Sequence, residues 1–282
     1  MPLETTATLI AAAQAHNIAV GAFNVITLEH IEGVIAGAES AGLPVVLQVS
    51  QNAVAFHGGA LLPLAGAARA AGAAASIAVS LHLDHVTSFE LLEQCAEAGF
   101  SSAMFDAGAL PFAENVERTL RAVEWCHAHE IWIEAEIGYI GGKPGDLVAA
   151  HAAGARTEPE EAARFASATG VDSLAVAVGS SHAMTTRTAT LDHELIGRLA
   201  ESVRVPLVLH GSSGVTDADL SLAISAGIRK VNVGTALNVA YTSAVRETLD
   251  ADDALVDPRR YLEPARDRVS EKVAALLRLV NG

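Results

Sequence analysis

Short apolar runs alternate with helix-like segments along almost the whole chain. Eight apolar runs are each followed by a stretch rich in Ala, Leu and Glu, and Gly or Pro commonly separates the two. Near-continuous apolar strands that alternate with helices are typical of a parallel sheet covered on both faces. The expected strands are residues 19–25, 44–50, 77–84, 102–107, 131–138, 173–178, 206–210 and 229–234. The expected helices are residues 5–16, 28–41, 59–71, 89–98, 114–127, 159–168, 193–202 and 217–226.

Eight strand–helix units in 282 residues predict a closed α/β barrel. A (β/α)8 or TIM barrel typically takes about 250 residues, and no linker rich in Pro, Ser or Gly divides this sequence. We therefore expect a single TIM-barrel domain over residues 1–282, with additional helices at the termini. An open, doubly wound sheet is the alternative. No GxGxxG turn follows an expected strand and opens a helix, which weakens its dinucleotide-binding version.

Composition and charge narrow the class of partner. Hydrophobic residues make up 51% of the chain, which is enough for a large core and excludes a disordered protein. The 18 basic and 33 acidic residues give a net charge of -15, so nothing attracts the chain to nucleic acid or anionic lipid in general. An anionic ligand would need a local binding site.

The sequence shows neither a membrane span, nor a signal peptide, nor a disulfide framework. No apolar stretch approaches the roughly 20 residues that span a bilayer, and the N-terminus lacks the basic start and apolar run of a signal peptide. Cys95 and Cys126 have no metal-site or disulfide-framework spacing, so we interpret them as buried reduced thiols. These features predict a soluble cytoplasmic protein.

One long Gly-rich connection interrupts the alternation. Residues 139–157 follow the fifth expected strand and contain four glycines. Such a connection in a compact barrel is often an active-site lid. A disordered surface excursion is the alternative.

Polar side chains gather where the expected strands end, which is where TIM barrels carry their active sites. The set contains imidazole, carboxyl, amide and hydroxyl groups: Asn24, Ser50, His82, Asp84, His85, Asp106, Glu134, Glu136, His182, His210 and Asn232. Projected onto one barrel mouth, they form a ring of imidazoles and carboxylates.

Three histidines of this ring, His85, His182 and His210, follow separate strands and can converge on one Zn2+ with the fourth position open, as in catalytic zinc sites. Imidazole suits Zn2+, Co2+ or Fe2+ better than Mg2+. One such histidine alone would more commonly be structural, but three at strand ends favour a metal site. Asp84 would face the open position and move a proton on a bound hydroxyl, or else accept a hydrogen bond from a histidine. His82 would point inward or support a neighbour.

Two turns with Gly and small polar residues indicate a phosphate site. Residues 211–214 read GSSG after the seventh strand, and residues 232–235 read NVGT after the eighth. Phosphate sites in TIM barrels typically use these two loops, with backbone N–H groups and a helix N-terminus as donors. Tight turns without a ligand are the alternative.

Together these motifs resemble the class II, metal-dependent fructose-bisphosphate and tagatose-bisphosphate aldolase family. The similarity runs nearly end to end, and HLDH and LHGSSG are specific in this order. The matching segments are GAFNV at 21–25, HLDH at 82–85, FDA at 105–107, EAEIG at 134–138, VGSSH at 178–182, LHGSSG at 209–214, KVNV at 230–233 and DPR at 257–259.

The resemblance implies roles for individual residues. His85, His182 and His210 would bind one catalytic Zn2+, and Glu136 stands where the family has a further metal-associated carboxylate. Asp84 would be the acid/base on the C4 hydroxyl. Asn232 would position the enediolate. The substrate and its phosphate would contact Asn24, Ser50, Gly211, Ser212, Ser213, Asn232, Val233, Gly234, Thr235 and Arg259. Relatives often use a monovalent cation, Na+ or K+, and form homodimers or homotetramers.

The implied activity is reversible cleavage of fructose-1,6-bisphosphate or tagatose-1,6-bisphosphate to dihydroxyacetone phosphate and an aldehyde. Cleavage leaves negative charge on the three-carbon fragment, which a Lewis-acid metal would carry. A Schiff base at Lys230 would leave the three histidines unexplained. A metal-dependent lyase or epimerase on another sugar phosphate is the second possibility. A non-catalytic barrel that supports an active aldolase is the third, and the retained Asp84 argues against it.

Two departures from the family pattern leave the sugar open. The family carries acidic residues just after the Gly-Gly of the long loop, but here Gly142 precedes Lys143 and the nearest acid is Asp146. We expect Asp146 to take over the carbon-proton exchange, or protonation to proceed differently. Ala183 follows His182, where many relatives have a Gly that contacts phosphate.

Overall fold

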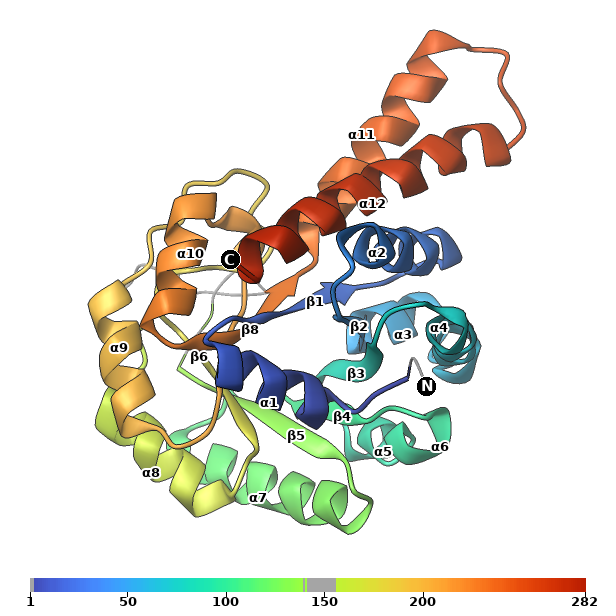
Figure 1. Cartoon of the computed structure of the whole chain (residues 1–282). Coiled ribbons are helices and arrows are strands. Elements are labelled where there is room, and N and C mark those ends of the chain that lie inside the picture. The colour runs from blue at the N-terminus through green and yellow to red at the C-terminus, as the bar shows by residue number, and fades with distance from the viewer. Residues whose placement is uncertain (1–2, 139, 141–155) are drawn as a thin grey trace.

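The computed structural model describes residues 3–138, 140 and 156–282, and these form a closed barrel of eight parallel strands (Figure 1). Each strand pairs with the next, and β8 closes the barrel against β1. The predicted TIM barrel is thereby confirmed. The strands are β1 Val20–Asn24, β2 Val45–Ser50, β3 Val79–Val86, β4 Ser102–Phe105, β5 Trp132–Ile137, β6 Ser173–Val176, β7 Leu207–Leu209 and β8 Ile228–Val233.

Helices surround the barrel and follow the expected order, with two local differences. Ser50 ends β2 and its hydroxyl accepts a hydrogen bond from the Ala53 N–H, which starts an unforeseen short helix, α3. The single helix expected over 89–98 is divided in two. The helices are α1 Thr6–His16, α2 Leu28–Ala41, α3 Gln51–Phe56, α4 Leu62–Ala74, α5 Phe89–Leu92, α6 Cys95–Ala98, α7 Phe112–Ala128, α8 Pro159–Thr169, α9 His193–Ser202, the 3-10 turn η1 Ser212–Gly214, α10 Asp217–Ala226, α11 Thr235–Ala251 and α12 Arg259–Val280.

Alternate side chains of each strand face opposite sides of the barrel wall. On β5, Ile133, Ala135 and Ile137 are buried in the main apolar core between the strands and the helices. Glu134 and Glu136 occupy the intervening positions and are equally buried, but they point into the barrel interior, where they meet His210. The interior of this barrel is therefore polar toward its carboxyl end.

The opposite end of the barrel is closed by α1, which packs against β1, β3 and β8 (Figure 1). Leu9 and Ile10 of α1 form a small separate core with apolar residues of β1 and β2. The Thr6 hydroxyl lies 2.6 Å from Ser102 Oγ and 3.0 Å from Ser80 Oγ, so the polar groups at this end pair with one another. This plug leaves the carboxyl ends of the strands as the accessible mouth.

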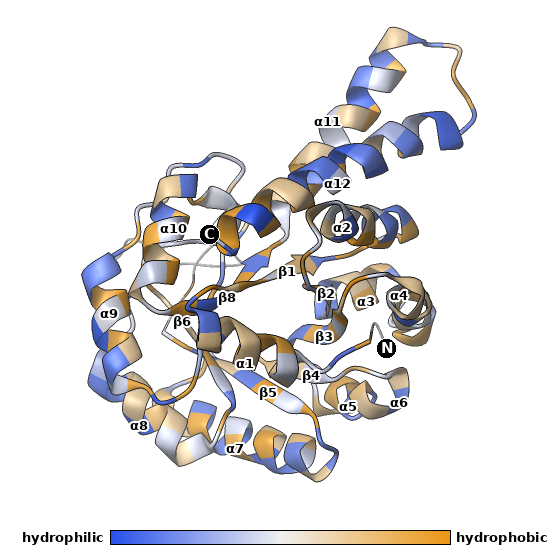
Figure 2. Cartoon of the chain, in the orientation of Figure 1, coloured by the Kyte–Doolittle hydropathy of each residue, from blue (hydrophilic) through white to orange (hydrophobic). Residues whose placement is uncertain are grey.

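The last two helices form a hairpin that projects beyond the barrel (Figure 1). Gly33 and Gly37 of α2 allow α12 to approach closely, because a Cβ at Gly37 would lie 2.5 Å from the Ser270 carbonyl oxygen. The outer part of α12 is mostly hydrophilic (Figure 2). Terminal helices were expected, but their projection was not. In the part of the chain that the structure describes, no helix is long and apolar enough to span a bilayer.

Candidate active site

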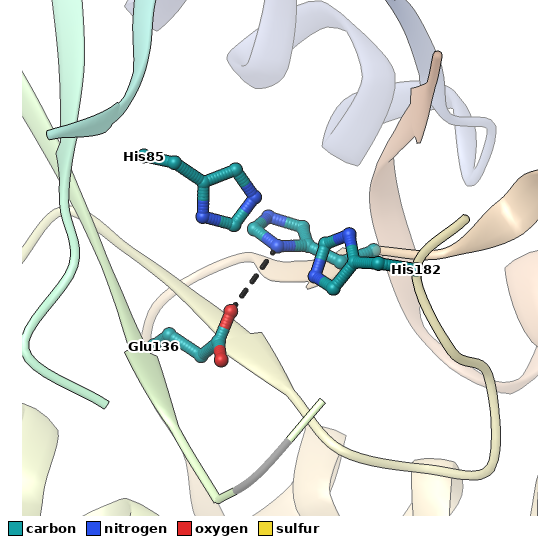
Figure 3. Close-up of side chains that lie close together, drawn as sticks. His85, Glu136 and His182 are labelled. Atoms are coloured by element: carbon teal, nitrogen blue, oxygen red, sulfur yellow. Dashed lines mark ion pairs between the residues drawn. The ribbon is translucent and has the colours of Figure 1, made fainter. Parts of the chain in front are cut away.

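Three imidazoles and one carboxylate converge at the barrel mouth. Each of His85, Glu136, His182 and His210 offers a ligand atom, and these atoms all lie within 4.8 Å of one another. Figure 3 shows His85, His182 and Glu136 pointing toward a common centre. The residues come from β3, from β5 and from the segments just after β6 and β7. The structure therefore brings together all four residues that the sequence proposed for the metal.

His85 is held at the end of β3 in an unusual backbone conformation. Its φ of 52° lies in the left-handed region, and the pairing of β3 with β4 shifts register between Leu83 and Val86. A non-glycine residue in this region stores about 1–2 kcal/mol of strain, and such strain concentrates at functional sites. The His85 Nδ1–H donates to Asp106 Oδ2 at 2.8 Å, which leaves Nε2 as the available lone pair.

His210 is clamped between two carboxylates inside the barrel. Its Nε2 lies 2.9 Å from Glu134 Oε1, and its Nδ1 lies 3.3 Å from Glu136 Oε2. Burial alone would lower the pKa of His210, but the two carboxylates outweigh it and raise this pKa to about 9. Burial likewise raises the pKa of Glu134, yet the Lys230 ammonium and His210 bring it well below its usual range. In the metal-free protein His210 therefore carries a proton on both ring nitrogens at neutral pH.

The donor set fits a borderline divalent metal. Imidazole nitrogens and a carboxylate oxygen are the ligands of Zn2+ in catalytic sites. A metal ion placed among them would take over the positive charge that a proton on His210 supplies in its absence. His210 Nδ1 and Glu136 Oε2 are both buried beside this centre.

Asp84 lies next to the cluster and is oriented by a relay of amides. Asn24 Nδ2 donates to Asp84 Oδ2 at 2.8 Å, and Gln48 Nε2 donates to Asn24 Oδ1 at 3.3 Å. Burial raises the pKa of Asp84, but electrostatic interactions with His85, His82, His210 and Lys230 more than offset it and bring the pKa to about 2. Asp84 is thus ionised at neutral pH and can accept a proton. Gln48 escaped the sequence reasoning, although its inward position on β2 could have revealed it.

A cavity of about 800 Å3 opens over these groups. It is lined by most of the residues expected to contact substrate, namely Asn24, Ser50, Gly211, Ser213, Asn232, Gly234 and Thr235, and also by Asp84, His85 and His182. Both polar side-chain atoms of Asn232 are buried and make no hydrogen bond within the described residues, so they are available to a ligand. Ser212 and Val233 do not line this cavity. The Ser212 hydroxyl donates to the Leu209 carbonyl at 3.2 Å, and Val233 packs in the helix-side core.

The two turns after β7 and β8 meet at the start of α11. Gly211 has a φ of 66°, and a Cβ there would lie 2.5 Å from the Ser181 carbonyl oxygen, so only glycine allows this approach. Ser213 Oγ accepts a hydrogen bond of 2.9 Å from the Ala236 N–H of α11. The first N–H groups of α11 thus lie beside Gly234 and Thr235 at the cavity, where a helix N-terminus favours an anion.

Two further predicted residues are not placed in this cavity. Arg259 begins α12 at the outer end of the hairpin, its side chain is 89% exposed, and it pairs with Asp257 at 2.7 Å. It therefore does not reach the cavity of its own chain. Asp146, on the long loop after β5, lies outside the described residues.

Comparison with known proteins decides the family. Residues 4–282 match the family described as fructose-bisphosphate aldolase class-II. The chain belongs to the class II fructose-bisphosphate aldolase family. It is 37% identical over 279 residues to a probable fructose-bisphosphate aldolase of Bacillus subtilis, covering 99% of this chain and 97% of that protein. It is 36% identical over 281 residues to a fructose-bisphosphate aldolase of Staphylococcus epidermidis, with the same coverage.

Solved structures agree with this aldolase assignment. The YdjI aldolase of Escherichia coli K12 superposes with a TM-score of 0.86 at 33% identity, covering 99% of this chain and 97% of that one. A putative fructose-1,6-bisphosphate aldolase of Coccidioides immitis also gives 0.86, at 32% identity and with 98% and 95% covered. Family membership supports aldol cleavage of a ketose bisphosphate and a metal-dependent site.

Lys230 does not have the access to substrate that a Schiff-base lysine needs. Lys230 is fully buried, its Nζ donates to Glu134 Oε2 at 2.9 Å, and it does not line the cavity. An amine that forms a Schiff base must reach the substrate carbonyl. The Schiff-base alternative at Lys230 is therefore disfavoured.

Ala183 stands where many relatives of the family have a glycine. Its φ of 57° lies in the left-handed region, which glycine would adopt without strain.

Proposed function

We propose that the protein is a zinc-dependent aldolase that reversibly cleaves a ketose bisphosphate of the fructose-1,6-bisphosphate or tagatose-1,6-bisphosphate type. The products are dihydroxyacetone phosphate and an aldehyde. The observation that carries the proposal is the position of ionised Asp84 beside a three-histidine, one-carboxylate cluster, under a cavity with an anion-binding end. The names of the Bacillus and Staphylococcus relatives support a fructose-type substrate.

The cluster and Asp84 divide the chemistry between them. A divalent metal held by His85, His182 and His210, with Glu136 beside it, would supply the Lewis acid for the charge that develops on the three-carbon fragment. Asp84 accepts the C4 hydroxyl proton in cleavage and returns it in condensation. Asn24 donates to Oδ2 of that carboxylate and so fixes its orientation.

The other cavity residues bind and orient the sugar. The N-terminus of α11 and the glycines at 211 and 234 let a phosphate approach backbone N–H groups. Asn232 offers an amide with both donor and acceptor unused within the described residues, which suits the hydroxyl and carbonyl oxygens of the three-carbon fragment. Ser50 lines the cavity beside Asp84. A monovalent cation, Na+ or K+, near the phosphate would offset its charge.

The rest of the proposal concerns parts distant from the metal. We assign the exchange of the carbon proton to Asp146 of the long loop. We further propose a cytoplasmic homodimer or homotetramer, in which Arg259 serves the cavity of a neighbouring subunit. The exposed position of Arg259 at the outer end of the hairpin supports this assignment.

One experiment tests metal and substrate together. Protein stripped with a chelator is reconstituted with Zn2+, Co2+ or Mg2+, and triose phosphate release is followed with fructose-1,6-bisphosphate, tagatose-1,6-bisphosphate and other ketose phosphates. We expect Zn2+ to restore cleavage of one bisphosphate. Asp84→Asn should keep its zinc and lose at least about 100-fold in kcat, the scale of general acid/base catalysis. The proposal would be overturned if the metal-free protein cleaved a ketose phosphate. It would also be overturned if the zinc-loaded protein cleaved none of the ketose phosphates tested.

A further inference from the structure

Beneath the metal cluster the barrel holds an ion pair for which the proposed reaction has no use. Lys230 of β8 and Glu134 of β5 are 0% and 1% exposed, and neither lines the cavity. Lys and Glu are almost never fully buried unless they are paired. Their side chains cross the barrel interior and meet at 2.9 Å between Nζ and Oε2. Burial of these two charges is costly, which indicates a function of the Lys230–Glu134 pair beyond packing.

The second oxygen of Glu134 reaches a proposed metal ligand. Oε1 lies 2.9 Å from His210 Nε2, while Oε2 is engaged by the Lys230 ammonium. Each carboxylate oxygen therefore has its own partner, and the carboxylate plane is fixed by two contacts on different strands. Because a carboxylate can only accept, His210 Nε2 must carry the hydrogen of this bond.

That hydrogen determines which nitrogen of His210 faces the metal. The other ring nitrogen, Nδ1, points to Glu136, a member of the metal cluster, at 3.3 Å. A neutral imidazole has one protonated and one lone-pair nitrogen, and the hydrogen bond made by the first assigns the second. We propose that Lys230 and Glu134 are positioning residues that hold His210 as the Nε2–H tautomer and so present Nδ1 to the metal. This proposal rests on the metal site of the proposed function.

Lys230 orients Glu134 through the bond to Oε2. It donates three hydrogens and accepts none, so it demands an oxygen at the Oε2 position. In Glu134→Gln the side-chain amide has only one oxygen. Lys230 would take that oxygen, and the NH2 group would face His210 Nε2. His210 would then be driven to the Nδ1–H tautomer, which has no lone pair for the metal.

Substitution of Lys230 should restore part of the zinc affinity that Glu134→Gln loses. In Glu134→Gln with Lys230→Met, nothing demands oxygen at the Lys230 side, so the amide can turn and accept from His210 Nε2–H again. We expect Glu134→Gln to weaken zinc binding by about 10- to 100-fold, the usual effect of losing a group that orients a ligand. The double variant should bind zinc at least about threefold more tightly than Glu134→Gln alone. A merely structural pair would instead give a double variant that binds zinc no better than the single one.

The experiment combines zinc affinity with a direct view of the tautomer. Zinc dissociation constants are measured by competition with a chelator, and 15N NMR of the zinc-loaded protein identifies the protonated nitrogen of His210. Ser173→Ala is the matched control, because Ser173 is buried on β6 directly across from Glu134 but contacts Trp132 rather than His210. Its zinc affinity should stay within about threefold of the wild type, against the 10- to 100-fold expected for a ligand-orienting group.

The wild-type spectrum keeps the test decisive even where a variant does not fold. Zinc-loaded wild type should show hydrogen on His210 Nε2 and coordination through Nδ1; the reverse assignment overturns the proposal. So does unchanged zinc affinity in folded Glu134→Gln, or a double variant that binds zinc no more tightly than the single one. Wild type that coordinates zinc through Nδ1 but cleaves no ketose phosphate would refute only the proposed reaction.

Discussion

Acid should destabilise the metal-free protein through His82, which lies in the barrel interior beside Ser102. The imidazole is fully buried, and its Nδ1 lies 2.8 Å from Ser102 Oγ. Burial, and then the charge of Lys230, lower the pKa of His82 from 6.5 to about 3, although Glu134 and Asp84 act in the opposite direction. His82 is therefore neutral in the folded protein over a pH range in which the unfolded chain binds a proton.

The sign and size of the effect follow from this difference in proton binding. Because the unfolded state binds more protons between pH 6.5 and about 3, the free energy of unfolding falls as the pH falls through that window. A group that is protonated only in the unfolded state contributes at most about 1.4 kcal/mol per pH unit, and the unfolded histidine is half protonated at pH 6.5, so between pH 6.5 and 4.5 His82 lowers the free energy of unfolding by about 2 kcal/mol. This is a large share of the stability of a typical domain.

His82→Gln isolates this contribution. Glutamine keeps a polar group near Ser102 but does not titrate. The free energy of unfolding of both metal-free proteins is measured by urea denaturation at several pH values from 6.5 to 4.5. Carboxylates such as Asp84 lose stabilisation in both proteins, so the wild type should lose about 2 kcal/mol more than the variant. Ser102→Ala, which retains His82, should keep the steep dependence. Parallel curves for wild type and His82→Gln would refute the assignment of a neutral buried imidazole.

Packing and site geometry make other substitutions informative. Gly37→Ala should lower the free energy of unfolding by about 1–3 kcal/mol, because its Cβ would clash with a backbone carbonyl of α12. Gly66→Ala on α4 is the control: its Cβ meets open space, so it should raise the free energy of unfolding by about 0.5–1 kcal/mol. Thermal denaturation compares the two, and equal shifts would contradict the close approach. Gly211→Ala should raise KM for the phosphorylated ketose at least about tenfold with zinc still bound, since the cavity loop must move. An unchanged KM in steady-state assays would show that this turn takes no part in substrate binding. Asn24→Ala should lower kcat by about 10- to 100-fold, through misplacement of Asp84, without releasing zinc; kcat close to wild type would remove Asn24 from that role.

The barrel could be predicted because its signals are local. The alternation of side chains along β5 places Glu134 and Glu136 on one face and three apolar residues on the other, and this follows from strand geometry alone. All eight strands lie within a few residues of their expected positions. Errors occurred where hydrogen bonding of single residues decides the outcome, as when the Ser50 hydroxyl starts α3 directly after β2.

The cluster of three histidines and Glu136 was also accessible from the sequence, since the carboxyl ends of parallel strands must meet at one barrel mouth. Motif and spacing could name His85, His182 and His210, but they carry no information on ring orientation. Which nitrogen of each imidazole is available depends on contacts between distant segments, such as Asp106 for His85 and Glu134 for His210.

The sequence by itself therefore determined the fold class, the ring of polar groups and the family resemblance, because each depends on local periodicity or short motifs. Tertiary structure alone decided the link from Lys230 through Glu134 to His210, which joins β8, β5 and the segment after β7 across the barrel interior. It also placed Arg259 on a projecting hairpin, away from the cavity that its motif suggested. Such relations depend on register and barrel closure, and distance along the chain does not encode them.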